Sequence, residues 1–220
     1  FAEKYQLATY SIDGTHYTTG DTSEIIKAYT RQCVSQVINE YPDLTGLGVS
    51  LGEAMGGMTP LERENWIFET FIEGMKQADR KIKFIHRVPF SANKSSGGSV
   101  AASTENMTRE AIEGIEHVKL PIHTELKYNW SHGHSSPNLY KVHGGKLTDA
   151  YWNPDPENYT INFMIRNEDF FCLRWGQPDF IRQFIANNSK GKDYVTGFYI
   201  GSECYIPAVD YFTKDGKGKY

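Results

Sequence analysis

Polar side chains recur at a nearly constant interval along this chain of 220 residues. Each ends or closely follows a short run rich in β-branched and aromatic residues, which is the composition of a strand. The six residues are Asp13, Glu53, Arg87, Glu125, Asn167 and Glu203, separated by 40, 34, 38, 42 and 36 positions. Binding and catalytic groups of parallel α/β sheets and barrels lie at the carboxyl ends of the strands. We therefore expect these side chains to border one site.

Three glutamates in this set are candidate catalytic groups. Glu53 lies in the glycine-flanked turn GVSLGEAMGG, where a partly apolar pocket would raise its pKa towards that of a general acid. A capping or loop carboxylate is the alternative interpretation of Glu53. Glu125 shares a strand face with His123 and Lys127, either as a catalytic cluster or as a structural ion-pair network. Glu203 shares a face with Tyr199 of its own strand.

Further polar and aromatic residues near the strand ends are candidate substrate-binding groups. Arg87, Arg166 and Arg174 could hold a carboxylate or sulfate group through paired hydrogen bonds, or they could pair with neighbouring acids. Aromatic rings could form apolar platforms for sugar rings, although core packing is the more common role of such rings. The other candidates are His123, Lys127, Tyr128, Trp130, His132, Asn167, Glu168, Trp152 and Trp175.

Metal and thiol chemistry have weaker sequence support. The pair His132 and His134 could ligate a metal with His86 and His123, but the chain has no H-E-x-x-H pattern. We therefore predict neither a metal site nor a cofactor. The cysteines, Cys33, Cys172 and Cys204, form no C-x-x-C pair, and we expect three free thiols.

Strand-like runs alternate with stretches of helical periodicity, which predicts an α/β fold with a parallel sheet. Helices are expected from Asp21 or Thr22 to about Glu40, from Thr59-Pro60 onwards, over Thr108–His117 and after Pro178. The predicted strands are Tyr5–Asp13, Thr45–Gly52, Lys81–Val88, Val118–Tyr128, Tyr159–Arg166 and Tyr194–Ser202.

The near-constant spacing favours a (β/α)8 TIM-type barrel, of which about six β/α units fit in this sequence. We expect residues 1–220 to be part of a single catalytic barrel domain, with two units before Tyr5 and a closing helix after Tyr220 outside the chain. A doubly wound six-stranded sheet is the alternative, but the sequence has no G-x-G-x-x-G loop and no P-loop.

Composition excludes several classes of protein. The 23 basic and 27 acidic residues give a net charge of −4, which argues against a nucleic-acid partner. No apolar run approaches the roughly 20 residues of a membrane span. With 39% hydrophobic and 14% aromatic residues, the chain is not disordered.

Five longer runs carry a family resemblance: YPDLTGLGVSLGEAM, KIKFIHR, ELKYNWSHGHSSP, RNEDFFCLRWGQPDF and GFYIGSECY. Together they resemble bacterial glycoside hydrolases of the alpha-glucuronidase-like kind, which are large (β/α)8 enzymes of polysaccharide-degrading bacteria. The resemblance covers most of the chain and implies hydrolysis of a glycosidic bond to a uronic acid or a related sugar. It implies Glu53 as the acid, with Glu125 or Glu203 as base or nucleophile.

The hypothesis is therefore a periplasmic or secreted glycoside hydrolase whose partner is an acidic oligo- or polysaccharide. Paired carboxyl groups flanking an oxocarbenium-like transition state would perform the chemistry. Two alternatives remain open: a metal-dependent barrel hydrolase or isomerase that uses the histidines, and a non-catalytic carbohydrate-binding barrel fragment. The sequence leaves the sugar, the linkage, the stereochemical outcome and the oligomeric state open.

Overall fold

Five parallel strands form one open sheet. The computed structural model describes residues 23–50, 58–88, 102–126, 137–139, 147–165 and 178–200. The strands are β1 (Gly46–Ser50), β2 (Lys83–Arg87), β3 (Lys119–Leu126), β4 (Tyr159–Ile165) and β5 (Val195–Ile200). The helices are α2 (Glu24–Glu40), α3 (Pro60–Ile67), the π-helix η1 (Phe68–Ile72), α4 (Glu73–Lys76), α5 (Ala102–Glu113) and α6 (Pro178–Ser189).

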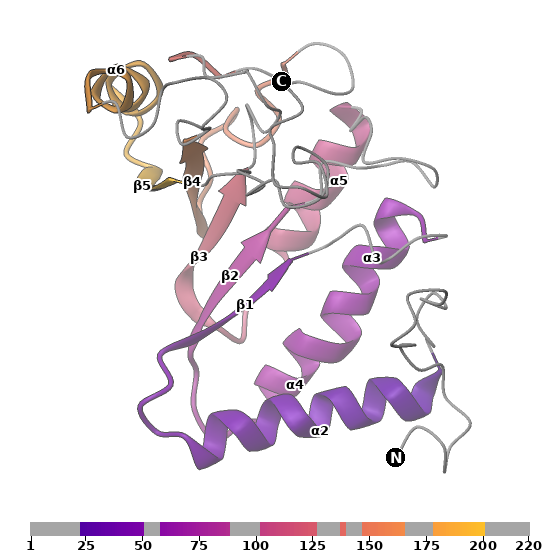
Figure 1. Ribbon diagram of the computed structural model, residues 1–220. Coiled ribbons are helices and arrows are strands. Elements are labelled where there is room, and N and C mark those ends of the chain that lie inside the picture. Colours follow the sequence, from indigo (N-terminus) through magenta and orange to yellow (C-terminus); the bar gives the residue numbers. More distant parts are fainter. Residues whose placement is uncertain are drawn as a thin grey trace, which may run out of the picture.

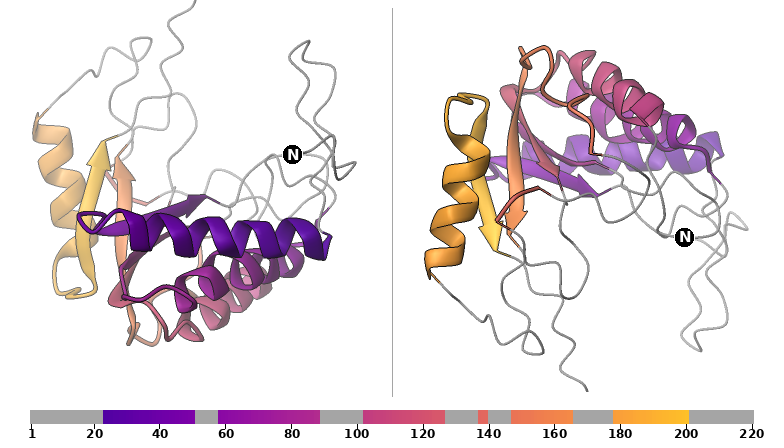
Figure 2. Two further views of the ribbon diagram at one scale, coloured as in Figure 1. Left: turned by 90° about the horizontal axis from the view of Figure 1, so that it is seen from below. Right: turned by 90° about the horizontal axis from the view of Figure 1, so that it is seen from above.

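Strand order follows the sequence, β1-β2-β3-β4-β5, and each neighbouring pair is parallel. The sheet curves, and the helices that connect its strands lie on its outer side (Figures 1 and 2). This one-sided arrangement is the one expected when consecutive parallel strands are joined by crossovers of the usual right hand. A doubly wound sheet needs a reversal of strand order, and the described strands contain none. The α/β parallel-sheet prediction is confirmed, and the described sheet is not closed.

Alternation along the strands separates the two faces of the sheet. Residues that point to the helices are buried, and these include Phe84, Ile122, Leu126, Ile161 and Phe163. Their sequence neighbours point to the opposite side of the sheet and are partly exposed or fully exposed. The helix-covered face therefore forms the hydrophobic core.

Local signals in the sequence fix the start of α3. The Thr59 hydroxyl accepts a hydrogen bond from the backbone N–H of Glu62 (3.3 Å), and the Glu62 carboxylate accepts one from the backbone N–H of Thr59 (2.6 Å). This reciprocal capping box, with Pro60 in the first turn, confirms the predicted helix start.

Close packing of α2 against α4 depends on one glycine. A Cβ atom on Gly74 would lie 2.8 Å from Cβ of Val34 and 2.9 Å from the carbonyl oxygen of Arg31. No side chain larger than hydrogen fits there without separating the two helices. Gly74 therefore sets the distance between α2 and α4.

At the other end of the sheet, an aromatic cluster holds α6 against β4 and β5. Phe163 of β4 lies 6.4 Å from Phe198 of β5, and Phe198 meets Phe184 of α6 edge-on at 6.2 Å between ring centroids. Trp152 also packs edge-on against Phe163, at 6.2 Å. Trp152 thus belongs to the core, which is the more common of the two roles considered for it.

Helix α5 differs from its prediction, since it covers Ala102–Glu113 rather than Thr108–His117. The Asn158 side-chain amide donates to the carbonyl oxygens of Ile112 and Glu113 at 3.3 and 3.1 Å, which terminates the helix there. This contact comes from a residue 45 positions further along the chain than Glu113, and helical periodicity cannot reveal it. It also anchors the start of β4, whose first residue follows Asn158.

The predicted strand Tyr5–Asp13 lies outside the described residues. Within the described part of the chain, no helix has both the length and the apolar character needed to cross a membrane. Cys33 is a free thiol there, as predicted, whereas Cys172 and Cys204 lie outside that part.

A buried carboxylate–imidazole pair joins α3 to β2. The Glu64 carboxylate and the His86 Nε2 atom are 2.9 Å apart, and the two side chains are 4% and 1% exposed. His86 lies on the helix-covered face of β2, directly before Arg87 on the opposite face. The second polar atom of each side chain, Oε1 of Glu64 and Nδ1 of His86, has no hydrogen-bond partner among the described residues. Each side chain therefore depends on the other for its hydrogen bond.

We expect Glu64→Ala to lower the free energy of unfolding by about 3 kcal/mol or more, because it leaves a buried imidazole without a partner. Urea denaturation followed by circular dichroism measures this change. The control is Asp179→Ala, which breaks a pair with Arg182 whose side chains are 75% and 73% exposed. The control should shift stability by no more than about 0.5 kcal/mol, and equal effects of the two substitutions would contradict the prediction.

Candidate functional site

One row of residues in register crosses all five strands, at the carboxyl ends of β1 and β2, one residue before the end of β3, and within β4 and β5. Ser50 of β1 is in register with Arg87 of β2, Arg87 with Glu125 of β3, Glu125 with Asn162 of β4, and Asn162 with Gly197 of β5. We call these five residues the polar row. All five belong to the set that points away from the helix-covered face. Adjacent strands in a sheet are about 4.8 Å apart, so each member of the row lies beside the next.

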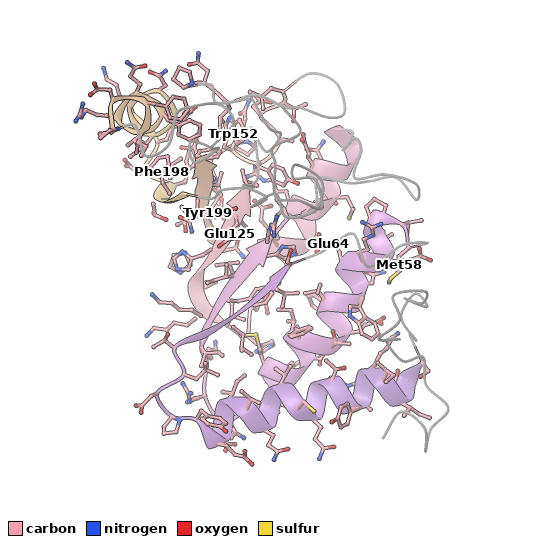
Figure 3. All side chains as sticks on the ribbon, viewed as in Figure 1. Met58, Glu64, Glu125, Trp152, Phe198 and Tyr199 are labelled. Atoms are coloured by element: carbon pink, nitrogen blue, oxygen red, sulfur yellow. The ribbon has the colours of Figure 1, made fainter. Side chains whose placement is uncertain are left out.

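The centre of the polar row carries opposite charges. Arg87 and Glu125 are both half-buried. Neither side chain forms a hydrogen bond or an ion pair with another described residue. The guanidinium group can donate paired hydrogen bonds to an anion, and the carboxylate can accept them from a hydroxyl group or activate one. Figure 3 shows Glu125 near the end of β3, with Tyr199 near the end of β5.

His123 lies two residues before Glu125 on the same face of β3. Its Nδ1 atom is 3.1 Å from the Thr160 hydroxyl of β4. Burial, and to a lesser degree the positive charge of Lys83, hold the pKa of His123 below the ordinary value for histidine. Near neutral pH the ring is therefore neutral. It can act as a hydrogen-bond donor or acceptor on the amino-terminal side of the polar row.

Besides Trp152, which packs against the core, three of the predicted site residues lie in the described part of the chain: Arg87, His123 and Glu125. The structure brings these three together on two adjacent strands. The remaining predicted site residues lie outside the described residues: Glu53, Glu203, Lys127, Tyr128, Trp130, His132, Arg166, Asn167, Glu168, Arg174 and Trp175. The predicted common edge is thus confirmed for Arg87 and Glu125 and stays a prediction for the other members.

The register identifies a further residue. Asn162 is the residue of β4 in register with Glu125. The sequence contained a signal for it, because Thr160 and Asn162 alternate with Tyr159, Ile161 and Phe163 in the run YTINF. Asn167, at the end of the predicted strand, lies outside the described residues and stays a prediction.

Within residues 23–50, 58–88, 102–126, 137–139, 147–165 and 178–200, no group of three His, Cys, Asp or Glu side chains could hold a metal ion. His132 and His134 are outside these ranges. Comparison of the chain with family models, with curated proteins and with solved structures finds no match.

The lowered pKa of His123 predicts a pH dependence of stability. The folded protein releases the His123 proton more readily than the unfolded chain, so folding is favoured above the ordinary histidine pKa of about 6.5. That contribution is lost as the pH falls from about 6.5 towards the lowered value. We therefore expect His123→Asn to lose less stability than the wild type between pH 7.5 and pH 5.

Urea denaturation at the two pH values measures this difference. His117→Asn is the matched control, since His117 is exposed in the segment before β3. The control variant should keep the pH dependence of the wild type. An unchanged pH dependence in His123→Asn would show that His123 does not contribute to it.

Proposed function

We propose that this chain is part of a glycoside hydrolase that cleaves a bond to an acidic sugar, and that β1–β5 are strands of a (β/α)8 barrel. The observation that carries the proposal is the pair at the centre of the polar row, a carboxylate and a guanidinium side by side, each without an ion-pair partner among the described residues. The sequential strand order and the helices on one side of the sheet support the barrel.

Glycoside hydrolysis uses two carboxyl groups, one to protonate the leaving oxygen and one to act as base or nucleophile. Glu125 supplies one carboxyl group on the face opposite the helices. We propose Glu53 as the general acid and Glu125 or Glu203 as the second carboxylate. In the sequence, Glu53 follows Ser50 by three residues and Glu203 follows Gly197 by six, so both come after the polar row in the carboxyl direction.

Arg87 supplies the proposed preference for an acidic sugar. A guanidinium group can hold a carboxylate with two parallel hydrogen bonds, and a neutral sugar offers no such partner. Placed beside Glu125, it would fix the charged substituent of the sugar while the carboxylate acts at the glycosidic bond. Arg87 is thus proposed to orient the substrate, and the carboxyl groups to perform the chemistry.

The role of Glu125 is tested by turnover measurements on the full-length protein. The substrates are 4-nitrophenyl α-D-glucuronide and oligosaccharides that carry a uronic acid. Glu125→Gln keeps the size of the side chain but removes its charge, and we expect it to lower kcat by about 10²-fold or more. Glu110→Gln is the control, because Glu110 is an exposed carboxylate of α5 on the helix-covered side. A Glu125→Gln variant with wild-type kcat on both substrates would refute the assigned role of Glu125.

Comparing a uronide with the corresponding neutral glucoside tests Arg87. Arg87→Met should weaken binding of the uronide by about tenfold to a hundredfold, which is the range of a lost hydrogen bond to a charged group. Binding of the glucoside should change little. The measurement is the ratio of the KM values for the two 4-nitrophenyl glycosides, and equal losses on both would contradict the proposed recognition of a carboxylate.

A further inference from the structure

Asn162 lies over the backbone of the neighbouring strand. A Cβ atom on Gly197 would lie 2.4 Å from Oδ1, 3.1 Å from Cγ and 3.7 Å from Nδ2 of Asn162. The first distance is shorter than any packed contact, so the carboxamide occupies the space that a side chain at position 197 would need. Only glycine at this position leaves the Asn162 side chain where it is.

An irregularity in β5 creates this arrangement. Ile161 is in register with Val195, but the next residue, Asn162, is in register with Gly197. Thr196 is therefore an extra residue in β5, that is, a β-bulge. Without it, Thr196 would pair with Asn162 and place a branched side chain against the carboxamide. The bulge and the glycine together give Asn162 its space.

The carboxamide has unused hydrogen-bonding capacity. Asn162 is half-buried, lies beside Glu125 in the polar row, and forms no hydrogen bond with another described residue. An asparagine side chain offers two N–H donors and one carbonyl acceptor. This combination suits sugar hydroxyl groups, each of which is both a donor and an acceptor.

We propose that Asn162 binds hydroxyl groups of the sugar next to Glu125, and that Gly197 is a positioning residue that acts through Asn162. The inference rests on the proposed function for its choice of ligand. Arg87 makes the charged contact with the sugar in the proposed function. Asn162 adds a neutral contact that selects hydroxyl groups. Recognition would then extend along the polar row from β2 to β4.

The experiment is an NMR titration of the full-length protein with D-glucuronic acid, a sugar that needs no turnover in order to be bound. Asn162→Ala should raise the dissociation constant by about threefold to tenfold, the range of a lost neutral hydrogen bond. Gly197→Ala should have a similar effect by displacing the carboxamide. In Asn162→Ala/Gly197→Ala, the second substitution should add nothing, because the group it displaces is already absent.

Gly48→Ala is the matched control. Gly48 lies on the same face of the sheet, but a Cβ atom there would make only an ordinary contact, 3.5 Å from Cβ of Ile85. This variant should bind D-glucuronic acid within twofold of the wild type. With 4-nitrophenyl α-D-glucuronide, Asn162→Ala and Gly197→Ala should raise KM more than they lower kcat, as expected for lost binding and not for lost folding.

An unchanged dissociation constant in Asn162→Ala would overturn the proposal for Asn162, and a full effect of Gly197→Ala in the Asn162→Ala background would overturn the positioning role. If Gly197→Ala does not fold, the wild-type protein still provides a test. Its Asn162 side-chain amide signal, which is assigned by its loss in Asn162→Ala, should shift on titration with D-glucuronic acid. An unshifted signal refutes the proposal. Failure of the proposed function has a different signature, namely wild-type turnover in Glu125→Gln with these binding effects intact. A wild-type protein that does not bind D-glucuronic acid overturns the inference itself.

Discussion

The division of the sheet into two faces is the constraint on which the rest of the structure depends. Consecutive strands are parallel neighbours, and the described helices lie on one side of the sheet (Figure 2). That side must be apolar in order to exclude water, and alternation along each strand then assigns every second residue to the other side. The polar row follows from this division, since a side chain such as Arg87 could not be placed among the core residues without a partner.

His86 shows the consequence of that constraint on the covered side. It is the polar residue of β2 that points into the core, and it is accommodated only through its hydrogen bond with Glu64. Replacement of both side chains by apolar groups could give an equally stable core, whereas loss of one partner is costly. The pair also fixes the position of α3 relative to β2, and therefore the position of Arg87, the next residue in the chain.

Much of this fold could be predicted from the sequence, because its signals are local. The runs that became β2 and β3 show the alternation of half-buried strands, and Thr59 and Pro60 mark the start of α3. The register between strands has no such signal. The bulge at Thr196 depends on how β4 and β5 pair, so the pairing of Asn162 with Gly197 could not be predicted, whereas the alternation in YTINF does indicate the face on which Asn162 lies. The end of α5 has both kinds of signal: Gly114 follows its last residue directly, and Asn158 caps it from outside the helix.

Among the described residues, the polar row differs from a structural ion-pair network, the alternative for His123, Glu125 and Lys127, of which Lys127 lies outside the described residues. In such a network each charge is neutralised by a partner, because an unpaired charge loses part of its hydration without compensation. Arg109 of α5 shows the pattern: it binds Glu113 at 2.8 Å and the carbonyl oxygen of Ala150 at 3.2 Å. Arg87 and Glu125 have no such partners among the described residues although they are neighbours in the row. A row in which both charges remain available is suited to binding a polar ligand. The bulge leaves room for the carboxamide of Asn162, which adds a neutral hydrogen-bond donor and acceptor to the row.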